Sequence, residues 1–222
     1  MFTKTLWRAF WFVALGACFA CFVEEKGFAS DSNEALLHVA VHNDAGVGAA
    51  LVAGAEKAAG RIFGLAGLRV EWVNCGRPGE SEMEVRRCAQ AEYPTHLQLR
   101  ILARPRNVTA TTFGISYVDA DGRGCYSEIF AEQAEDLEAD AGLRSVILGH
   151  VMAHELAHLL LGTNSHALAG IMRARWQAAD FRSVGKEELL FSAKESEVMR
   201  VKVALELNAR NAIASRDTAS AD

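Results

Sequence analysis

The sequence predicts a single α+β domain. Three stretches between residues 35 and 102 have the composition of β-strands, and an alanine-rich stretch typical of a helix separates the first two. A later stretch, from Val146 to Leu161, is almost entirely apolar, which predicts a buried helix. With 50% hydrophobic residues, the chain can bury one sizeable core. We therefore expect a small twisted mixed sheet, a covering helix, the buried helix and a C-terminal helix within residues 30–207.

The N-terminus has the composition of an export signal. Lys4 and Arg8 flank the start of an apolar run from Ala9 to Val23. At about 15 residues, this run is shorter than the roughly 20 that a transmembrane helix needs. We therefore expect a signal peptide within residues 1–29 and no membrane span in the mature chain. The mature protein would be periplasmic, secreted or lipid-anchored at the cell envelope.

The signal has more than one possible cleavage site. Cleavage after Ala20 or after Ala29 would release the mature chain. Alternatively, Leu15-Gly16-Ala17-Cys18 resembles a bacterial lipobox, in which case the signal ends before Cys18 and this cysteine carries a lipid anchor.

The elements before the buried helix follow from local composition. The dipeptide Asp121-Gly122 is a hairpin signal between two short strands. Charges, glycine and proline between residues 74 and 94 predict a long loop that holds a short helix. We expect His96 to face solvent from its strand. The predicted strands are residues 35–41, 68–73, 95–102, 113–118 and 125–129, and the predicted helices are residues 47–63 and 83–91.

Four side chains around the hairpin turn have two interpretations each. Asp119 and Asp121 are either calcium ligands or solvated turn residues, and the turn is favoured because the other ligands of a calcium motif are missing. Tyr117 and Tyr126 either donate hydrogen bonds to a developing oxyanion or pack against their neighbours.

Three cysteines lie beyond the signal. In an oxidising compartment Cys75 and Cys88 could form a disulfide across the polar loop between them. Cys125 is then a small buried apolar residue, or it takes one of the other two as its partner. A nucleophilic cysteine is not favoured, because no base is evident nearby.

The charge of the chain excludes one class of partner. Its formal net charge is −5, which provides no basic surface for nucleic acid. We therefore expect no nucleic-acid partner and a neutral or mixed substrate.

The buried helix carries His154, Glu155 and His158 in the order H-E-x-x-H. At about 100° per residue, the two histidines lie one turn apart on the same face, close enough to share a metal ion. Burying two imidazoles and a carboxylate is unfavourable unless a partner matches them, and a divalent cation with its water does so. Zn²⁺ suits neutral imidazole nitrogen, so we predict a zinc site with His154 and His158 as ligands.

The third predicted ligand is His166. If the helix stops near Leu161, the residues up to His166 can extend by roughly 3.3 Å each, which is ample to return to the metal.

The segment from His154 to His166 resembles the signature of the metzincin metallopeptidases, H-E-x-x-H-x-x-G-x-x-H. This chain has one extra residue before Gly162 and another before His166. The tripeptide Gly170-Ile171-Met172 resembles the methionine-containing turn that runs beneath the metal in that clan. The wider block from His158 to Trp176 looks like one that recurs in bacterial exported proteins.

The resemblance implies a zincin-type, metzincin-like fold and an enzymatic function. It implies a zinc-dependent metalloendopeptidase that hydrolyses peptide bonds with a zinc-bound water, with Glu155 as general base and His166 as third ligand. The hairpin of residues 113–129 would then supply an antiparallel edge strand, along which an extended peptide or protein substrate binds.

Two other functions are compatible with the motif. In a gluzincin-type peptidase, Glu187 or Glu188 would replace His166 as the third ligand. Alternatively, the protein is a catalytically silent, zinc-stabilised envelope binding protein.

Residues next to the motif also have alternative roles. His150, one turn before His154, is either a hydrogen-bonded core histidine, which we favour, or a group that orients a ligand. Met172 is as typical of the core as of a special turn. Arg173 and Arg175 either line the cleft or pair on the surface.

The C-terminal region begins with a helix signal. Ser192 and Glu195 match a capping box, which predicts a last helix to about Leu207. Small and polar residues then predict a flexible tail, residues 208–222.

Overall fold

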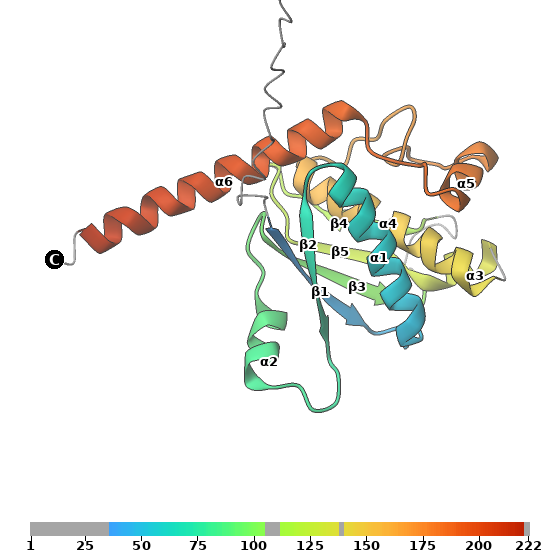
Figure 1. Cartoon of the computed structure of the whole chain (residues 1–222), viewed down its shortest axis with the longest axis horizontal. Coiled ribbons are helices and arrows are strands. Elements are labelled where there is room, and N and C mark those ends of the chain that lie inside the picture. The colour runs from blue at the N-terminus through green and yellow to red at the C-terminus, as the bar shows by residue number, and fades with distance from the viewer. Residues whose placement is uncertain (1–35, 105–111, 138–139, 220–222) are drawn as a thin grey trace, which may run out of the picture. The chain divides into compact units, whose positions relative to one another are not determined.

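A five-stranded mixed sheet lies at the centre of the fold (Figure 1). The computed structural model describes residues 36–104, 112–137 and 140–219, and the predicted signal peptide lies outside them. The strands are β1 (Leu36–Asn43), β2 (Arg69–Cys75), β3 (His96–Leu102), β4 (Gly114–Tyr117) and β5 (Tyr126–Phe130). Their order in the sheet is β2-β1-β3-β5-β4. All neighbours pair in parallel except β4, which pairs antiparallel with β5 at one edge.

The described residues also form six helices. They are α1 (Ala49–Leu65), α2 (Glu82–Ala89), α3 (Ala131–Leu137), α4 (Ala141–Leu161), α5 (Ala178–Gly185) and α6 (Ala193–Ala219). None of the helices in this part of the chain combines the length and the apolar composition that crossing a bilayer requires. The predicted α+β fold class, with its mixed sheet and hairpin, is confirmed.

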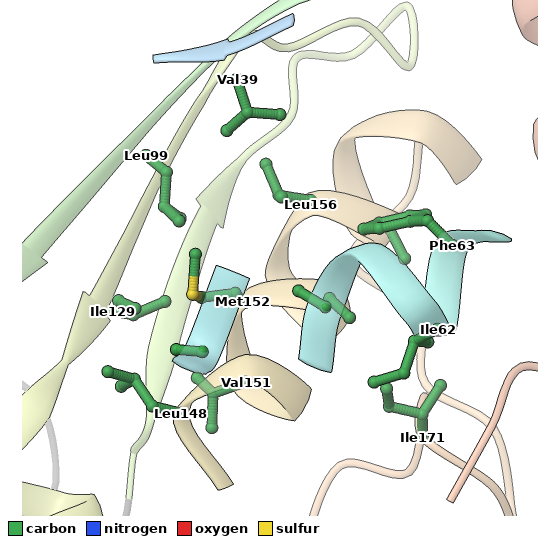
Figure 2. Close-up of a cluster of buried hydrophobic side chains, with 14 of the residues drawn as sticks. Val39, Ile62, Phe63, Leu99, Ile129, Leu148, Val151, Met152, Leu156 and Ile171 are labelled. Carbon is green, nitrogen blue, oxygen red and sulfur yellow. The ribbon is translucent and has the colours of Figure 1, made fainter. Parts of the chain in front are cut away.

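Helices α1 and α4 pack together on one face of the sheet. Alternation along the strands turns Val39, Leu99 and Ile129 toward this face, where they are fully buried. Figure 2 shows them gathered around Met152 of α4. The same cluster contains Leu148, Val151 and Leu156 of α4, Ile62 and Phe63 of α1, and Ile171. Fully burying one such side chain contributes about 1.5–3 kcal/mol, so this layer fixes α4 against the sheet.

Helix α2 lies against the opposite face of the sheet. Gln98 lies between two core residues of β3 and so points away from α4, and its amide donates to the backbone carbonyl of Cys88 at 2.9 Å. The predicted disulfide between Cys75 and Cys88 is confirmed, and it joins α2 to the end of β2. Cys125 is free and partly buried. Burial raises the pKa of its thiol, which disfavours a nucleophilic thiolate.

His96 lies on the sheet face away from the core, as expected, but it is only partly exposed. The parallel register places it beside His38, and the two rings stack with centroids 4.8 Å apart. Its side chain is 24% exposed. The period-two pattern predicts the face on which a residue lies, but it does not predict which neighbour covers it.

The C-terminal helix is longer than predicted. It continues past Leu207 to Ala219, so the predicted helix end near Leu207 is wrong, and residues 208–219 are helical. Arg210 lies on this extension and donates to the hydroxyl of Thr95 at 2.9 Å. A contact with a segment so distant in sequence cannot be read from local composition. Helices α3 and α5 were not predicted either, since both are short.

Removing the disulfide should lower the free energy of unfolding by about 3 kcal/mol, because it closes a loop between cysteines that are 13 positions apart. We expect urea denaturation of the double variant Cys75→Ser/Cys88→Ser to show this loss. Cys125→Ser is the matched control and should change stability much less. Equal stability of the parent and the double variant would contradict the prediction.

Candidate metal centre

The ends of α4 are well defined. Asp140 caps its start by accepting a hydrogen bond from the backbone N–H of Leu143 at 2.9 Å. Gly162 ends the helix with a φ of 68°, a left-handed conformation that glycine adopts without strain. A Cβ on Gly162 would overlap the carbonyl oxygen of Gly122, so the hairpin turn and the helix end meet backbone to backbone. The chain can therefore reverse at Gly162 and return toward α4.

Three histidines converge beside this reversal. The ligand nitrogens of His154, His158 and His166 all lie within 4.8 Å of one another, close enough to hold a metal ion. The His158 ring centroid is 4.8 Å from that of each of the other two. Among the residues that the structure describes, no other His, Cys, Asp or Glu joins this group or forms another. The structure thus brings the three predicted ligands together despite the two extra residues in the motif.

Backbone carbonyls determine which nitrogen carries the proton in two of the histidine rings. The Nδ1 atom of His154 lies 2.7 Å from the carbonyl oxygen of Ile171, and that of His158 lies 2.7 Å from the carbonyl oxygen of Thr163. A carbonyl can only accept, so each Nδ1 carries the proton and each Nε2 keeps its lone pair. The two Nε2 atoms are 3.1 Å apart. Two lone pairs at this distance repel each other, and a cation bound to both removes the repulsion.

Burial keeps the rings in the form that binds metal. It lowers the pKa of His154 to about 3, with His158 adding to the effect. Burial also lowers the pKa of His158 and of His166. All three imidazoles are therefore neutral near pH 7, as metal ligands must be.

The turn after the motif orients the site through its backbone. Besides the His154 ring, the carbonyl oxygen of Ile171 accepts the indole N–H of Trp176 at 3.0 Å. Gly170 reaches the turn conformation with a φ of 77°. Met172 is 1% exposed and belongs to the hydrophobic core. The Gly-Ile-Met turn thus orients the His154 ring through the Ile171 carbonyl, and Met172 packs in the core.

Glu155 lies against the edge strand β4. It is 6% exposed, and burial raises its pKa to about 7, with the hydrogen bond from Ser116 acting in the opposite direction. The Ser116 hydroxyl is 2.7 Å from Glu155 Oε2, and it also lies 3.1 Å from the Ser127 hydroxyl. A Cβ on Gly114 would lie 2.5 Å from Glu155 Cγ, so only glycine lets the strand pack this closely on the carboxylate. The Glu155 carboxylate is therefore held against β4 by close packing and by a hydrogen bond.

Two cavities lie along β4. The larger has a volume of about 570 Å³ and is lined by Gly114 of β4 together with His154, Glu155 and His166. A smaller one of about 370 Å³ is lined by Ser116 and Tyr117 of the same strand. The larger cavity thus gives a ligand access to the histidine group and to the carboxylate.

The two hairpin tyrosines do not donate hydrogen bonds to the site. The hydroxyls of Tyr117 and Tyr126 donate to Glu128, at 3.3 Å and 2.8 Å. Burial raises the pKa of Tyr126 to about 12, so this phenol stays protonated. Asp119 accepts the backbone N–H groups of Asp121 and Arg123, both at 2.9 Å, as a turn residue does.

Arg173, Arg175 and His150 are close to the motif in sequence. Arg173 and Arg175 line the larger cavity, and Arg173 pairs with Asp180 at 2.9 Å. His150 is fully buried and donates to the carbonyl of Val146 at 2.8 Å, which confirms the core interpretation.

The sequence interpretation missed the residues that hold Glu155. Gly114, Ser116 and Ser127 come from the hairpin, which is far from α4 in sequence. The only signal was that small residues alternate with large ones in the predicted strands, as Gly114 and Ser116 do with Ile115 and Tyr117.

No protein-family model matches this chain. Its sequence also matches no curated protein. The resemblance to the metzincins therefore rests on the residues from His154 to Met172.

Replacing Gly114 by alanine should destabilise the fold by about 1–3 kcal/mol, because the new methyl group collides with the Glu155 side chain. Thermal or urea unfolding would measure the loss. Gly64→Ala is the matched control: nothing lies within 4 Å of its added Cβ, and alanine favours the helix, so stability should rise slightly. If both variants behave alike, the tight packing of β4 on Glu155 is refuted.

Proposed function

We propose that this protein is a zinc-dependent metalloendopeptidase in which Glu155 is the general base. The observation that carries the proposal is the position of Glu155, whose buried carboxylate lines the same cavity as His154 and His166. A base beside a candidate metal site is the arrangement that metal-assisted amide hydrolysis needs. The resemblance of the motif to that of the metzincins supports the same chemistry.

Zinc is the metal that we assign to the three histidines. Three neutral imidazoles form a donor set that zinc prefers, and the described residues add no fourth protein ligand to the group. When bound there, zinc would supply a Lewis acid that activates a water molecule and polarises the scissile carbonyl.

Glu155 moves the proton in this proposal. Its carboxylate takes a proton from the attacking water and later delivers it to the nitrogen of the leaving amine. A pKa raised to about 7 suits both steps, because the group can accept and release a proton near neutral pH. Ser116, which lies 2.7 Å from Oε2, keeps one carboxylate oxygen engaged and so orients the other.

The edge strand β4 would align the substrate. It pairs with β5 on one side and ends the sheet, so its other side can accept an extended peptide by main-chain hydrogen bonds. The cavities at its two ends would then receive substrate side chains on either side of the scissile bond.

We infer that the enzyme works outside the cytoplasm. The support is the signal pattern in residues 1–29 and the disulfide between Cys75 and Cys88, which forms and persists in an oxidising compartment.

The variant Glu155→Gln should keep its zinc but lose turnover of a peptide library by at least about 100-fold, because the ligands remain while the base is lost. Metal analysis and fluorogenic peptide cleavage would measure the two effects. Glu187→Gln is the control, since Glu187 pairs with Arg61 at 3.1 Å and is not part of the histidine group. A parent protein that binds zinc but cleaves no peptide would favour the silent binding protein instead.

Removing His166 should weaken zinc binding by about 100-fold or more, because two imidazoles alone hold the ion poorly. Competition with a chromogenic chelator would compare His166→Ala with Glu187→Ala and Glu188→Ala. We expect the two glutamate variants to bind zinc like the parent. A loss confined to either glutamate variant would establish the gluzincin alternative.

A further inference from the structure

The larger cavity has aromatic walls beside the histidine group. Phe113, Trp176 and Phe181 line it, with Val151 of α4. The Trp176 ring centroid lies 6.3 Å from that of Phe113 and 6.0 Å from that of Phe181. These rings hold one another in place, so the wall is preformed. At about 570 Å³, the cavity can take an aromatic side chain and the backbone next to it.

One polar side chain in this cavity is buried and unsatisfied. Gln133 of α3 lines the cavity and is 8% exposed. Its Oε1 atom is buried and, within the described part of the chain, has no hydrogen-bond partner. A buried carbonyl oxygen without a partner is unfavourable. Oε1 itself has almost no accessible surface, so a bound ligand can satisfy it once the Gln133 side chain turns its amide toward the cavity.

The charges around the cavity favour a neutral ligand group. Asp136 and Glu155 contribute carboxylates, and Arg173 and Arg175 contribute guanidinium groups. Arg173 is already paired with Asp180. Arg175 would repel a lysine or arginine tip while Asp136 and Glu155 attract it, and an acidic tip would meet the reverse, so charge selects neither. A neutral side chain avoids both conflicts.

We propose that this cavity binds a tyrosine side chain of the substrate and that Gln133 selects it by hydrogen bonding to the phenol hydroxyl. The proposal rests on the peptidase function above. The aromatic walls fit the ring, and a phenol both donates and accepts, so it matches the Gln133 amide in either orientation. Phenylalanine fits the same walls but leaves the amide unsatisfied. A site built in this way discriminates against the ligand that lacks the hydroxyl.

The test measures binding without turnover. N-acetyl-tyrosine amide and N-acetyl-phenylalanine amide would each be titrated into ¹⁵N-labelled protein and followed by NMR chemical shifts. We expect the parent to bind the tyrosine compound about 3- to 10-fold more tightly, with shifts of the Gln133 side-chain amide. In Gln133→Leu, and in Gln133→Met as a second isosteric variant, this preference should disappear while the phenylalanine compound still binds.

Gln90→Leu is the matched control, because Gln90 is exposed and lies outside the cavity. Three outcomes would overturn the proposal: equal affinities in the parent, a preference that survives in both Gln133 variants, or no binding of either compound. Peptide cleavage is measured separately. If the protein prefers the tyrosine compound but cleaves no peptide, the peptidase function is refuted and the selectivity stands. If it cleaves peptides but shows no preference, the selectivity is refuted and the peptidase function stands.

Discussion

The arrangement of the site depends on two unprotonated imidazole nitrogens that lie close together in the interior. Both Nδ1 atoms of His154 and His158 donate to carbonyls, so no proton lies between the two Nε2 atoms, which are 3.1 Å apart. Burial lowers the pKa of both rings, so protonation does not relieve the contact. A metal ion does relieve it, and His166 lies where it can add a third ligand. The metal-binding interpretation thus follows from hydrogen bonding, independently of any sequence signature.

The rest of the fold holds this contact in place. Gly162 lets the chain reverse, which brings the Thr163 carbonyl to His158. Lys202 of α6 donates to the carbonyl of Leu161 at 2.7 Å, so the last helix also fixes the end of α4. On the other side, the Ile171 carbonyl holds both His154 and Trp176. Each ligand on α4 is therefore oriented by a backbone carbonyl, and backbone groups move less than side chains do.

The sequence predicted the parts of this structure that depend on local pattern. The three histidines follow from a helical repeat and one glycine, and the strands follow from alternation, so both could be predicted. The supports of Glu155 could not, because Gly114 and Ser116 meet it only through the pairing of β4 with β5 and the packing of both on α4. The same holds for Gln133, whose place in the cavity depends on the short helix α3. Contacts between distant segments decide these positions, and no local pattern encodes them.

Two opposing effects act on the Glu155 carboxyl. Burial disfavours its charged form and raises its pKa to about 7, while the Ser116 hydroxyl favours the carboxylate. A divalent cation at the histidines acts in the same direction as Ser116, because positive charge nearby stabilises the carboxylate. Metal binding at the histidines and ionisation of Glu155 would therefore be coupled, because a bound ion would favour the carboxylate form of Glu155. Without an ion, burial leaves the Glu155 carboxyl partly protonated near neutral pH, so a cation bound at the histidines would increase the fraction that is carboxylate.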